Sequence, residues 1–289
     1  MKKGILTKGA FILSMTVFGT IGLLVRFIGL GSAEIALYRA VMATLLVGGY
    51  LLISGKKISF KHLHGNLLLL LISGCAMGIN WVLLFEAYKY TTVSTATLSY
   101  YFAPVIVTVL SPIFFRERMT SKAWICFGAS TIGLVLITGM GDGSGNIKGI
   151  LFGLAAAIFY ATVMILNKFI KGVDGIVRTF MQFIASLAVL IPYVIFDGGF
   201  HISDLQGTGL ICLITVGILH TGVAYCLYFS SLCEMRGQEV AILSYIDPLV
   251  AVIISVMALG EPLTVPQIIG GVLILGFTLW NELSSNKAD

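Results

Sequence analysis

The chain has 289 residues, of which 58% are hydrophobic and only 11% are charged, and its formal net charge is +5. A water-soluble domain is usually about 25% charged, so this composition excludes a soluble protein and indicates a polytopic membrane protein. The basic residues are spread over loops that one membrane face would share, so the positive charge does not indicate nucleic-acid binding.

Ten apolar stretches, separated by loops rich in Gly, Pro, Ser or charge, predict membrane-spanning helices. In chain order they cover residues of about 9–28, 33–54, 65–87, 93–115, 122–139, 148–170, 174–196, 207–232, 238–258 and 264–283. The connections are short, so we expect an all-α fold in which residues 1–289 form a single membrane domain.

The loop charges predict the orientation of the chain. If the N-terminus is cytoplasmic, thirteen basic residues face the cytoplasm and at most three, Arg26, Lys89 and Lys148, face outward. Basic residues concentrate in the cytoplasmic loops of membrane proteins. We therefore expect a multi-pass protein of the cell (inner or plasma) membrane with both termini in the cytoplasm.

The second and third spans carry polar residues near their outer ends. Arg39 lies about 10 Å into the second span, and Glu86 lies near the outer end of the third. Glu86 has two candidate partners: Lys89, in a surface ion pair, or Arg39, in a pair that would form an outer gate. Asn80 and Trp81 lie deeper in the third span.

A motif in the fourth span recurs in the ninth. The stretch ATLSYYFAPVIVTVLSPIFFRERMT corresponds to AILSYIDPLVAVIISVMALGEPLT. When Pro104 is aligned with Pro248, Glu117 aligns with Glu261, at an offset of 144 residues. The first copy ends in basic residues and the second does not, which is expected if the copies lie on opposite sides of the membrane.

The repeat predicts two halves of five helices each, at about 1–142 and 143–289. A weaker match, at an offset of 143 residues, places Arg39 opposite Gln182. Because five is odd, the second half would cross the membrane in the opposite direction to the first. Inverted repeats of this kind are typical of secondary transporters, which bind substrate near the bilayer midplane between the halves.

The ten spans, the 5+5 inversion and a Pro followed by Glu-x-x-Thr at the ends of the fourth and ninth spans resemble the drug/metabolite transporter superfamily, EamA type. The segment NWVLLFEAYKYTTVSTATLSYYFAP is similar to that family's third and fourth helices. The resemblance implies transport of amino acids, organic cations, sugars or nucleotide-linked metabolites, often as proton-coupled exchange or facilitation. The chain has no HExxH, GxSxG, nucleotide-binding or metal-ligand motif, so we expect no enzyme activity, catalytic residue, metal or cofactor.

Asp247 is the most informative residue of the ninth span, because a charged Asp at midplane costs about 2.5–3.5 kcal/mol. Ser244, Asp247, Ala251 and Ser255 follow at helical spacings and predict a small or polar stripe that faces the bundle interior. Ala103 is the counterpart of Asp247 in the first half, so the charge departs from the repeat. Asp247 is either a proton or cation site, as a family carboxylate at this place would be, or a structural carboxylate capped by hydroxyls or a helix end.

Other candidates lie at similar depths. Pro104 and Pro248 are either hinges that line a cavity or kinks that membrane helices tolerate. His220 either shares a proton with Asp247 or forms a packing hydrogen bond. Gln182 resembles a family position and has an interhelical hydrogen bond as its alternative role.

The candidate solute site combines Asp247 and Glu86 with aromatic side chains: Phe18, Trp81, Tyr100, Tyr101, Tyr160 and Tyr225. Aromatic faces and an acid suit a quaternary ammonium such as choline, an amine, or the amino group of an amino acid. Arg39 is the one clear interior base, which disfavours phosphorylated solutes. Ordinary core and lipid-facing packing is the alternative explanation for the aromatic residues.

We therefore predict a secondary transporter that works by alternating access, with protons as the candidate coupling ion and Asp247 as their site. The alternatives are an exporter of other metabolites or drugs with the same fold, and a channel. The expected partners are a small-molecule substrate and membrane lipids, and the expected state is a monomer or a weak homodimer.

Overall fold

The computed structural model describes residues 2–54, 60–115, 121–139, 147–205, 207–232, 235 and 243–285, and the elements formed by these residues are all helical. The first half contains α1 (Lys2–Gly19), α2 (Ile21–Arg26), α3 (Ser32–Ile53), α4 (Phe60–Gly65), α5 (Leu67–Tyr90), α6 (Val93–Tyr100), α7 (Ala103–Phe115) and α8 (Ser121–Gly139). The second half contains α9 (Ile147–Phe169), α10 (Gly175–Phe196), the 3₁₀ turn η1 (Ile202–Asp204), α11 (Thr208–Thr215), the π-helical segment η2 (Val216–Val223), α12 (Ala224–Leu232), α14 (Ile246–Leu259) and α15 (Val265–Ser285).

Seven helical stretches within the described residues are long and apolar enough to cross a membrane. Three further apolar helices are shorter, and they cover Ser121–Ile137, Ile246–Leu259 and Val265–Asn281. Each of the ten spans expected from the sequence overlaps one of these stretches, which confirms an all-helical polytopic fold. That the three shorter helices also cross the membrane remains a prediction, and residues 238–242 of the expected ninth span lie outside the described part of the chain.

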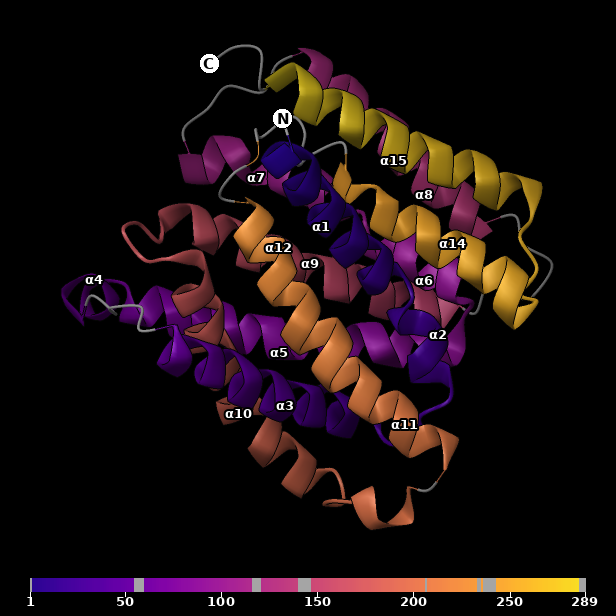
Figure 1. The fold of residues 1–289 in the computed structure, drawn as a ribbon. Coiled ribbons are helices and arrows are strands. Elements are labelled where there is room, and N and C mark those ends of the chain that lie inside the picture. The colour runs from indigo at the N-terminus through magenta and orange to yellow at the C-terminus, as the bar shows by residue number, and fades with distance from the viewer. Residues whose placement is uncertain are drawn as a thin grey trace.

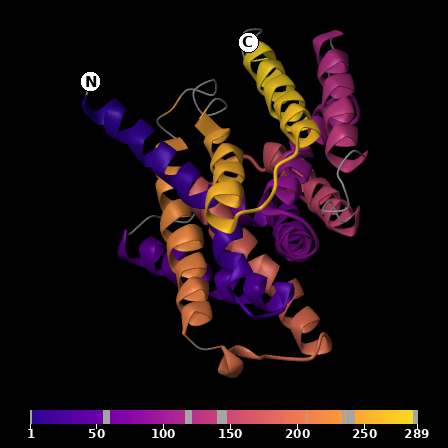
Figure 2. The ribbon, with the colours of Figure 1, turned by 90° about the vertical axis from the view of Figure 1, so that its right-hand side faces the viewer.

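The helices form one bundle with a distinct pair at its edge. Helix α5 packs along α9 and α10, and α3 packs on α10 and η2. Helices α8 and α15 lie side by side away from these (Figures 1 and 2). Glycine permits this close pairing, because a Cβ atom on Gly133 would lie 2.6 Å from the carbonyl oxygen of Gly270. The beginning of α1 and the end of α15 lie at the same end of the bundle in both views.

Several helices of the first half have a counterpart of similar length in the second. Helices α3 and α10 begin 143 residues apart, α7 and α14 also begin 143 apart, and α8 and α15 begin 144 apart. These spacings agree with the repeat offset read from the sequence. The inversion of one half relative to the other remains a prediction.

Four helical paths are irregular partway along the described chain. The first path turns at Thr20 between α1 and α2, the fourth is interrupted at Tyr101 between α6 and α7, and α14 begins after a turn at Tyr245. The eighth path is continuous but widens into η2. Tyr101 and Tyr245 are 144 residues apart, so the two copies of the repeated motif break at the same place.

The interruptions in the helical paths explain the positions of the two prolines. Pro104 is the second residue of α7 and Pro248 the third of α14. In the first turn of a helix a missing N–H leaves no hydrogen bond unmade, so proline is tolerated there. Asp247 lies in the first turn of α14, just after the interruption at Tyr245, and its expected place at the membrane midplane remains a prediction.

Candidate functional site

Asp247 lies where three of the helical irregularities meet. The Tyr101 hydroxyl, at the break between α6 and α7, donates a 2.6 Å hydrogen bond to Asp247 Oδ2. Gly19, at the end of α1, packs on the backbone of the same residue, since a Cβ atom there would lie 2.5 Å from the Asp247 carbonyl oxygen. Transporter sites are commonly built from discontinuous helices, which supply polar groups at membrane depth.

Arg39 is the buried cation of this region. Only 4% of the residue is exposed, and its Nε donates a hydrogen bond to Thr221 Oγ1 at 2.9 Å. The guanidinium carbon lies 4.3 Å from the ring centroid of Trp81 and 5.3 Å from that of Phe85. Among the described residues, no carboxylate lies within 4.0 Å of Arg39.

Three tyrosines lie within electrostatic range of both charges. The hydroxyls of Tyr88, Tyr100 and Tyr225 interact electrostatically with both Arg39 and Asp247. We call the following residues the central cluster: Arg39, Trp81, Tyr88, Tyr100, Tyr101, Tyr225 and Asp247.

The aromatic rings of the cluster are packed against further rings. The Tyr100 ring stacks on Tyr160 at 5.0 Å, and Tyr225 meets Phe18 and Phe183 at 5.1 and 5.4 Å. The structure therefore brings the expected aromatic residues Tyr100, Tyr101, Tyr160, Tyr225, Trp81 and Phe18 into one region.

The balance of charges in the cluster is incomplete. A buried charge without an opposite partner costs several kcal/mol, and cation–π contacts return about 0.5–2 kcal/mol each. In the described structure Arg39 and Asp247 do not pair with each other. A ligand that carries both charges would satisfy both side chains.

Of its two candidate partners, Glu86 pairs with Lys89, three residues along the same helix. Lys89 Nζ lies 3.1 Å from Glu86 Oε2, and the Ser32 hydroxyl donates to the same oxygen at 2.6 Å. The pair with Arg39, expected as an outer gate, does not form. Glu86 is therefore bound at the end of α5 rather than in the central cluster.

A second carboxylate, Glu261, connects the two halves at that end of the bundle. Glu261 Oε1 lies 2.6 Å from Nη2 of Arg26, which also donates to the Thr91 carbonyl oxygen at 2.6 Å. Glu261 Oε2 accepts from the amide of Val93, the first residue of α6, at 2.7 Å, and from the Ser255 hydroxyl. Glu261 thus supplies an acceptor for an otherwise unpaired first-turn donor. Sequence reasoning singled out Glu261 only as part of the repeat and missed this role.

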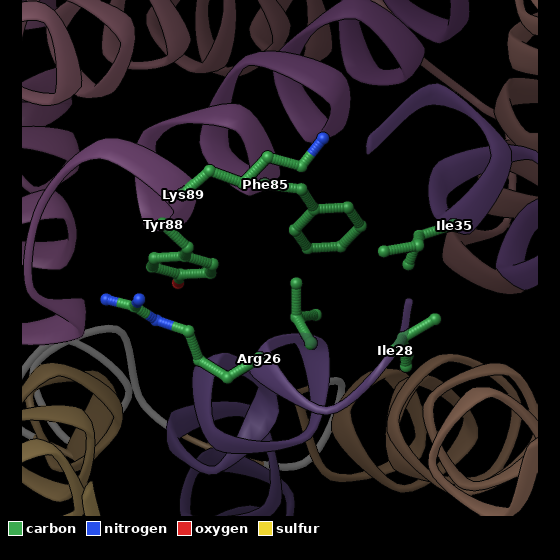
Figure 3. Close-up of a pocket in the computed structure, with 7 residues that line it drawn as sticks. Arg26, Ile28, Ile35, Phe85, Tyr88 and Lys89 are labelled. Carbon is green, nitrogen blue, oxygen red and sulfur yellow. The ribbon is translucent and has the colours of Figure 1, made fainter. Parts of the chain in front are cut away.

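A cavity of about 230 Å³ adjoins the central cluster. Its lining is mixed: Val25, Arg26, Ile28, Ile35, Phe85, Tyr88 and Lys89. Figure 3 shows Phe85 and Tyr88 reaching from α5 toward the segment that carries Arg26 and Ile28. Phe85 also lies beside the Arg39 guanidinium, so this ring stands between the cavity and the central cluster.

His220 forms packing contacts. Its Nε2 lies 2.8 Å from Thr20 Oγ1 and its Nδ1 lies 3.3 Å from the Thr215 carbonyl oxygen. No hydrogen bond joins it to Asp247 among the described residues. Of the two expected roles, these contacts fit the structural one.

Gln182 and Asn80 also bond between helices. Gln182 Nε2 donates to Ser73 Oγ of α5 and to Asn167 Oδ1 of α9, both at 2.8 Å. Asn80 Nδ2 donates to the Ala156 carbonyl oxygen of α9 at 2.6 Å. Both amides therefore hold α5 against neighbouring helices, and the structure places neither beside Asp247.

Comparison with known families identifies the chain. The model of the EamA-like transporter family matches residues 6–139 and again residues 147–281. The chain belongs to the EamA-like transporter family. It is accordingly a membrane transporter of the drug/metabolite transporter superfamily. The two matched segments of this EamA-family protein are separated by residues 140–146, and its division into two inverted halves remains a prediction.

Relatives that align with most of the chain are also named as transporters or solute carriers. The uncharacterized transporter YxxF of Bacillus subtilis is 33% identical, over 91% of this chain and 85% of its own length. An uncharacterized transporter of Archaeoglobus fulgidus is 28% identical over 95% of this chain and 96% of its own length. The mouse protein solute carrier family 35 member G1 is 26% identical over 85% of this chain and 69% of its own length.

A solved structure supports the fold alone. A protein known from a crystal structure superimposes with a TM-score of 0.63 at 17% identity, covering 94% of this chain and 95% of its own. The EamA-family protein therefore has a known helical architecture over nearly its whole length.

Proposed function

We propose that this EamA-family protein is a secondary transporter for a small zwitterion of the amino-acid class. The single observation that carries the proposal is the pair of opposite charges in the central cluster. Arg39 and Asp247 interact with the same three tyrosines, and among the described residues neither lies within 4.0 Å of an opposite charge.

The two charges fit the two ends of an amino acid. A guanidinium binds a carboxylate through parallel N–H groups, and a carboxylate with aromatic faces nearby binds an ammonium group. An amine or a quaternary ammonium such as choline would satisfy Asp247 but would leave Arg39 without an anion. This asymmetry is why we favour a zwitterion over the simpler cations that the sequence also allowed.

The proposed mechanism is alternating access across the plasma membrane, with both termini in the cytoplasm. Pro104 and Pro248, near the starts of α7 and α14, act as hinges. The interruptions before them leave backbone groups free to rearrange. The ion pair of Arg26 and Glu261 holds neighbouring helices together at the outer end of the bundle. Asp247 takes up a proton when the solute leaves, so that solute exchange is coupled to proton movement.

Counterflow in proteoliposomes tests this proposal. Vesicles that contain the purified protein and unlabelled L-leucine, L-phenylalanine or L-threonine are diluted into the labelled amino acid. We expect transient accumulation of at least one of them, which a channel would not give. Accumulation of choline or an alkylamine with none of the amino acids would contradict the zwitterion assignment. The absence of saturable counterflow with any solute would contradict carrier function.

A further inference from the structure

Thr221 occupies a position that the transport proposal leaves unexplained. It is fully buried, and its hydroxyl performs two tasks. The oxygen accepts the Nε–H of Arg39 at 2.9 Å, while the hydroxyl proton goes to the carbonyl oxygen of Val216 at 2.9 Å. The acceptor is five residues back, as the wide turn of η2 allows. The hydroxyl is thereby oriented with its lone pair toward Arg39.

The π-helical segment also fixes the distance between Thr221 and Arg39. A Cβ atom on Gly222 would lie 2.7 Å from Leu46 Cδ1, and one on Gly217 would lie 2.6 Å from Met42 Sδ. Met42 and Leu46 follow Arg39 by three and seven residues, so they share its face of α3. Segment η2 is therefore seated directly on the helix face that presents the arginine. π-helical turns are rare and often occur at functional sites.

The contacts already made by the Arg39 guanidinium show which of its N–H groups remain for a ligand. Thr221 accepts the hydrogen of Nε, and the ring centroids of Trp81 and Phe85 lie 4.3 and 5.3 Å from the guanidinium carbon. Within the described residues, Thr221 is the only hydrogen-bond acceptor for Arg39. The edge formed by Nη1 and Nη2 is left, and its two parallel N–H groups match the two oxygens of a carboxylate.

We propose that Thr221 is a positioning residue that holds Arg39 so that its Nη1–Nη2 edge receives the solute's carboxylate end-on. The inference rests on the proposed zwitterion site and adds a specificity rule to it. A carboxylate accepts two hydrogen bonds along this edge, whereas a carboxamide presents one acceptor and one donor. Solutes in which the carboxylate is replaced by an amide should therefore bind poorly.

The test compares Thr221→Val with Thr221→Ser and with Thr215→Val. Valine has the shape of threonine but no acceptor, and serine restores the hydroxyl. Thr215 lies six residues earlier on the same helical path, and its hydroxyl bonds to the Ile211 carbonyl oxygen. Initial rates are measured in proteoliposomes for L-leucine, L-phenylalanine and L-threonine and for their carboxamides.

We expect Thr221→Val to raise KM for the transported amino acid about tenfold, with a change in kcat below about threefold, because one charge-assisted hydrogen bond is lost. The same substitution should also lower the preference for the amino acid over its carboxamide. Thr221→Ser and Thr215→Val should remain within about threefold of the wild type. If Thr221→Val does not fold, Thr221→Ala makes the same comparison.

An unchanged KM and an unchanged acid-to-amide preference in a folded Thr221→Val protein would overturn the inference. Arg39→Gln in the same assay separates this failure from that of the proposed function. If Arg39→Gln abolishes uptake while Thr221→Val has no effect, the site stands and only the positioning role is wrong. If Arg39→Gln has no effect either, the carboxylate site itself is wrong.

Discussion

Two arginines in neighbouring parts of this protein have opposite surroundings. Arg26 is 31% exposed in its side chain and lies 2.6 Å from Glu261 Oε1. Arg39 is buried, contacts a hydroxyl and two rings, and has no carboxylate within 4.0 Å in the described part of the chain. The accessible cation is paired and the inaccessible one is not, which is the reverse of what stability alone would favour. The difference fits a structural role for Arg26, between helices, and the ligand-binding role that we propose for Arg39.

The largest expected effect is at Arg39. Arg39→Gln removes the charge that we assign to the solute's carboxylate, so uptake should fall by about 100-fold or more. Proteoliposome uptake of amino acids measures this, and Arg26→Gln is the matched control with an expected loss below about tenfold. Equal losses in the two variants would remove the distinction between the arginines.

The next effect concerns coupling at Asp247. Asp247→Asn keeps the shape and the contact with Tyr101 but cannot release a proton, so a pH gradient should no longer drive solute exchange. Transport under an imposed pH gradient measures this, with Glu86→Gln as the control because Glu86 bonds to Lys89 and Ser32 instead. Gradient-driven exchange at the normal rate in Asp247→Asn would show that Asp247 is not the coupling residue.

A smaller effect is expected on stability at Glu261. Glu261→Ala leaves Arg26 and the Val93 amide without this acceptor, and hydrogen bonds to charged groups contribute about 1.5–3 kcal/mol. The melting temperature of the purified protein should drop clearly. Glu86→Ala breaks a more exposed pair with Lys89 and should cost about 1 kcal/mol or less. A larger drop in Glu86→Ala would contradict the role given to Glu261.

The smallest effect is expected at His220. His220→Gln can keep a hydrogen bond to Thr20, so uptake and its pH dependence should stay within about threefold of the wild type. Uptake measured between pH 5 and pH 8 checks this. A shifted pH profile would restore the proton-sharing role that the contacts of His220 do not favour.

The helices were largely predictable from the sequence because a bilayer requires long apolar runs. The start of α14 was not, since a continuous apolar run does not reveal an interruption at Tyr245. Pro248 was visible, but a proline kinks one helix and begins another with the same sequence signature. The place of Asp247 at the start of a helix, and hence its surroundings, depended on that choice.

The contacts of the site were predictable only where they are local. Lys89 is three residues from Glu86, so their pairing followed from helical spacing. The bond from Arg39 to Thr221 joins residues 182 apart, and it depends on a π-helical turn that apolar periodicity does not encode. The link from Arg26 to Glu261 spans 235 residues and was missed because helical spacing predicts only contacts between near neighbours in the sequence.

The central claim is that Arg39 and Asp247 hold the two ends of one zwitterion. Binding of L-leucine, L-phenylalanine and L-threonine, and of the amines that lack their carboxylates, to the purified wild type and Arg39→Gln proteins tests it most directly. The account predicts that the wild type binds at least one amino acid about tenfold or more tightly than its amine, and that Arg39→Gln abolishes this preference. Equal binding of amino acid and amine by the wild type would contradict it.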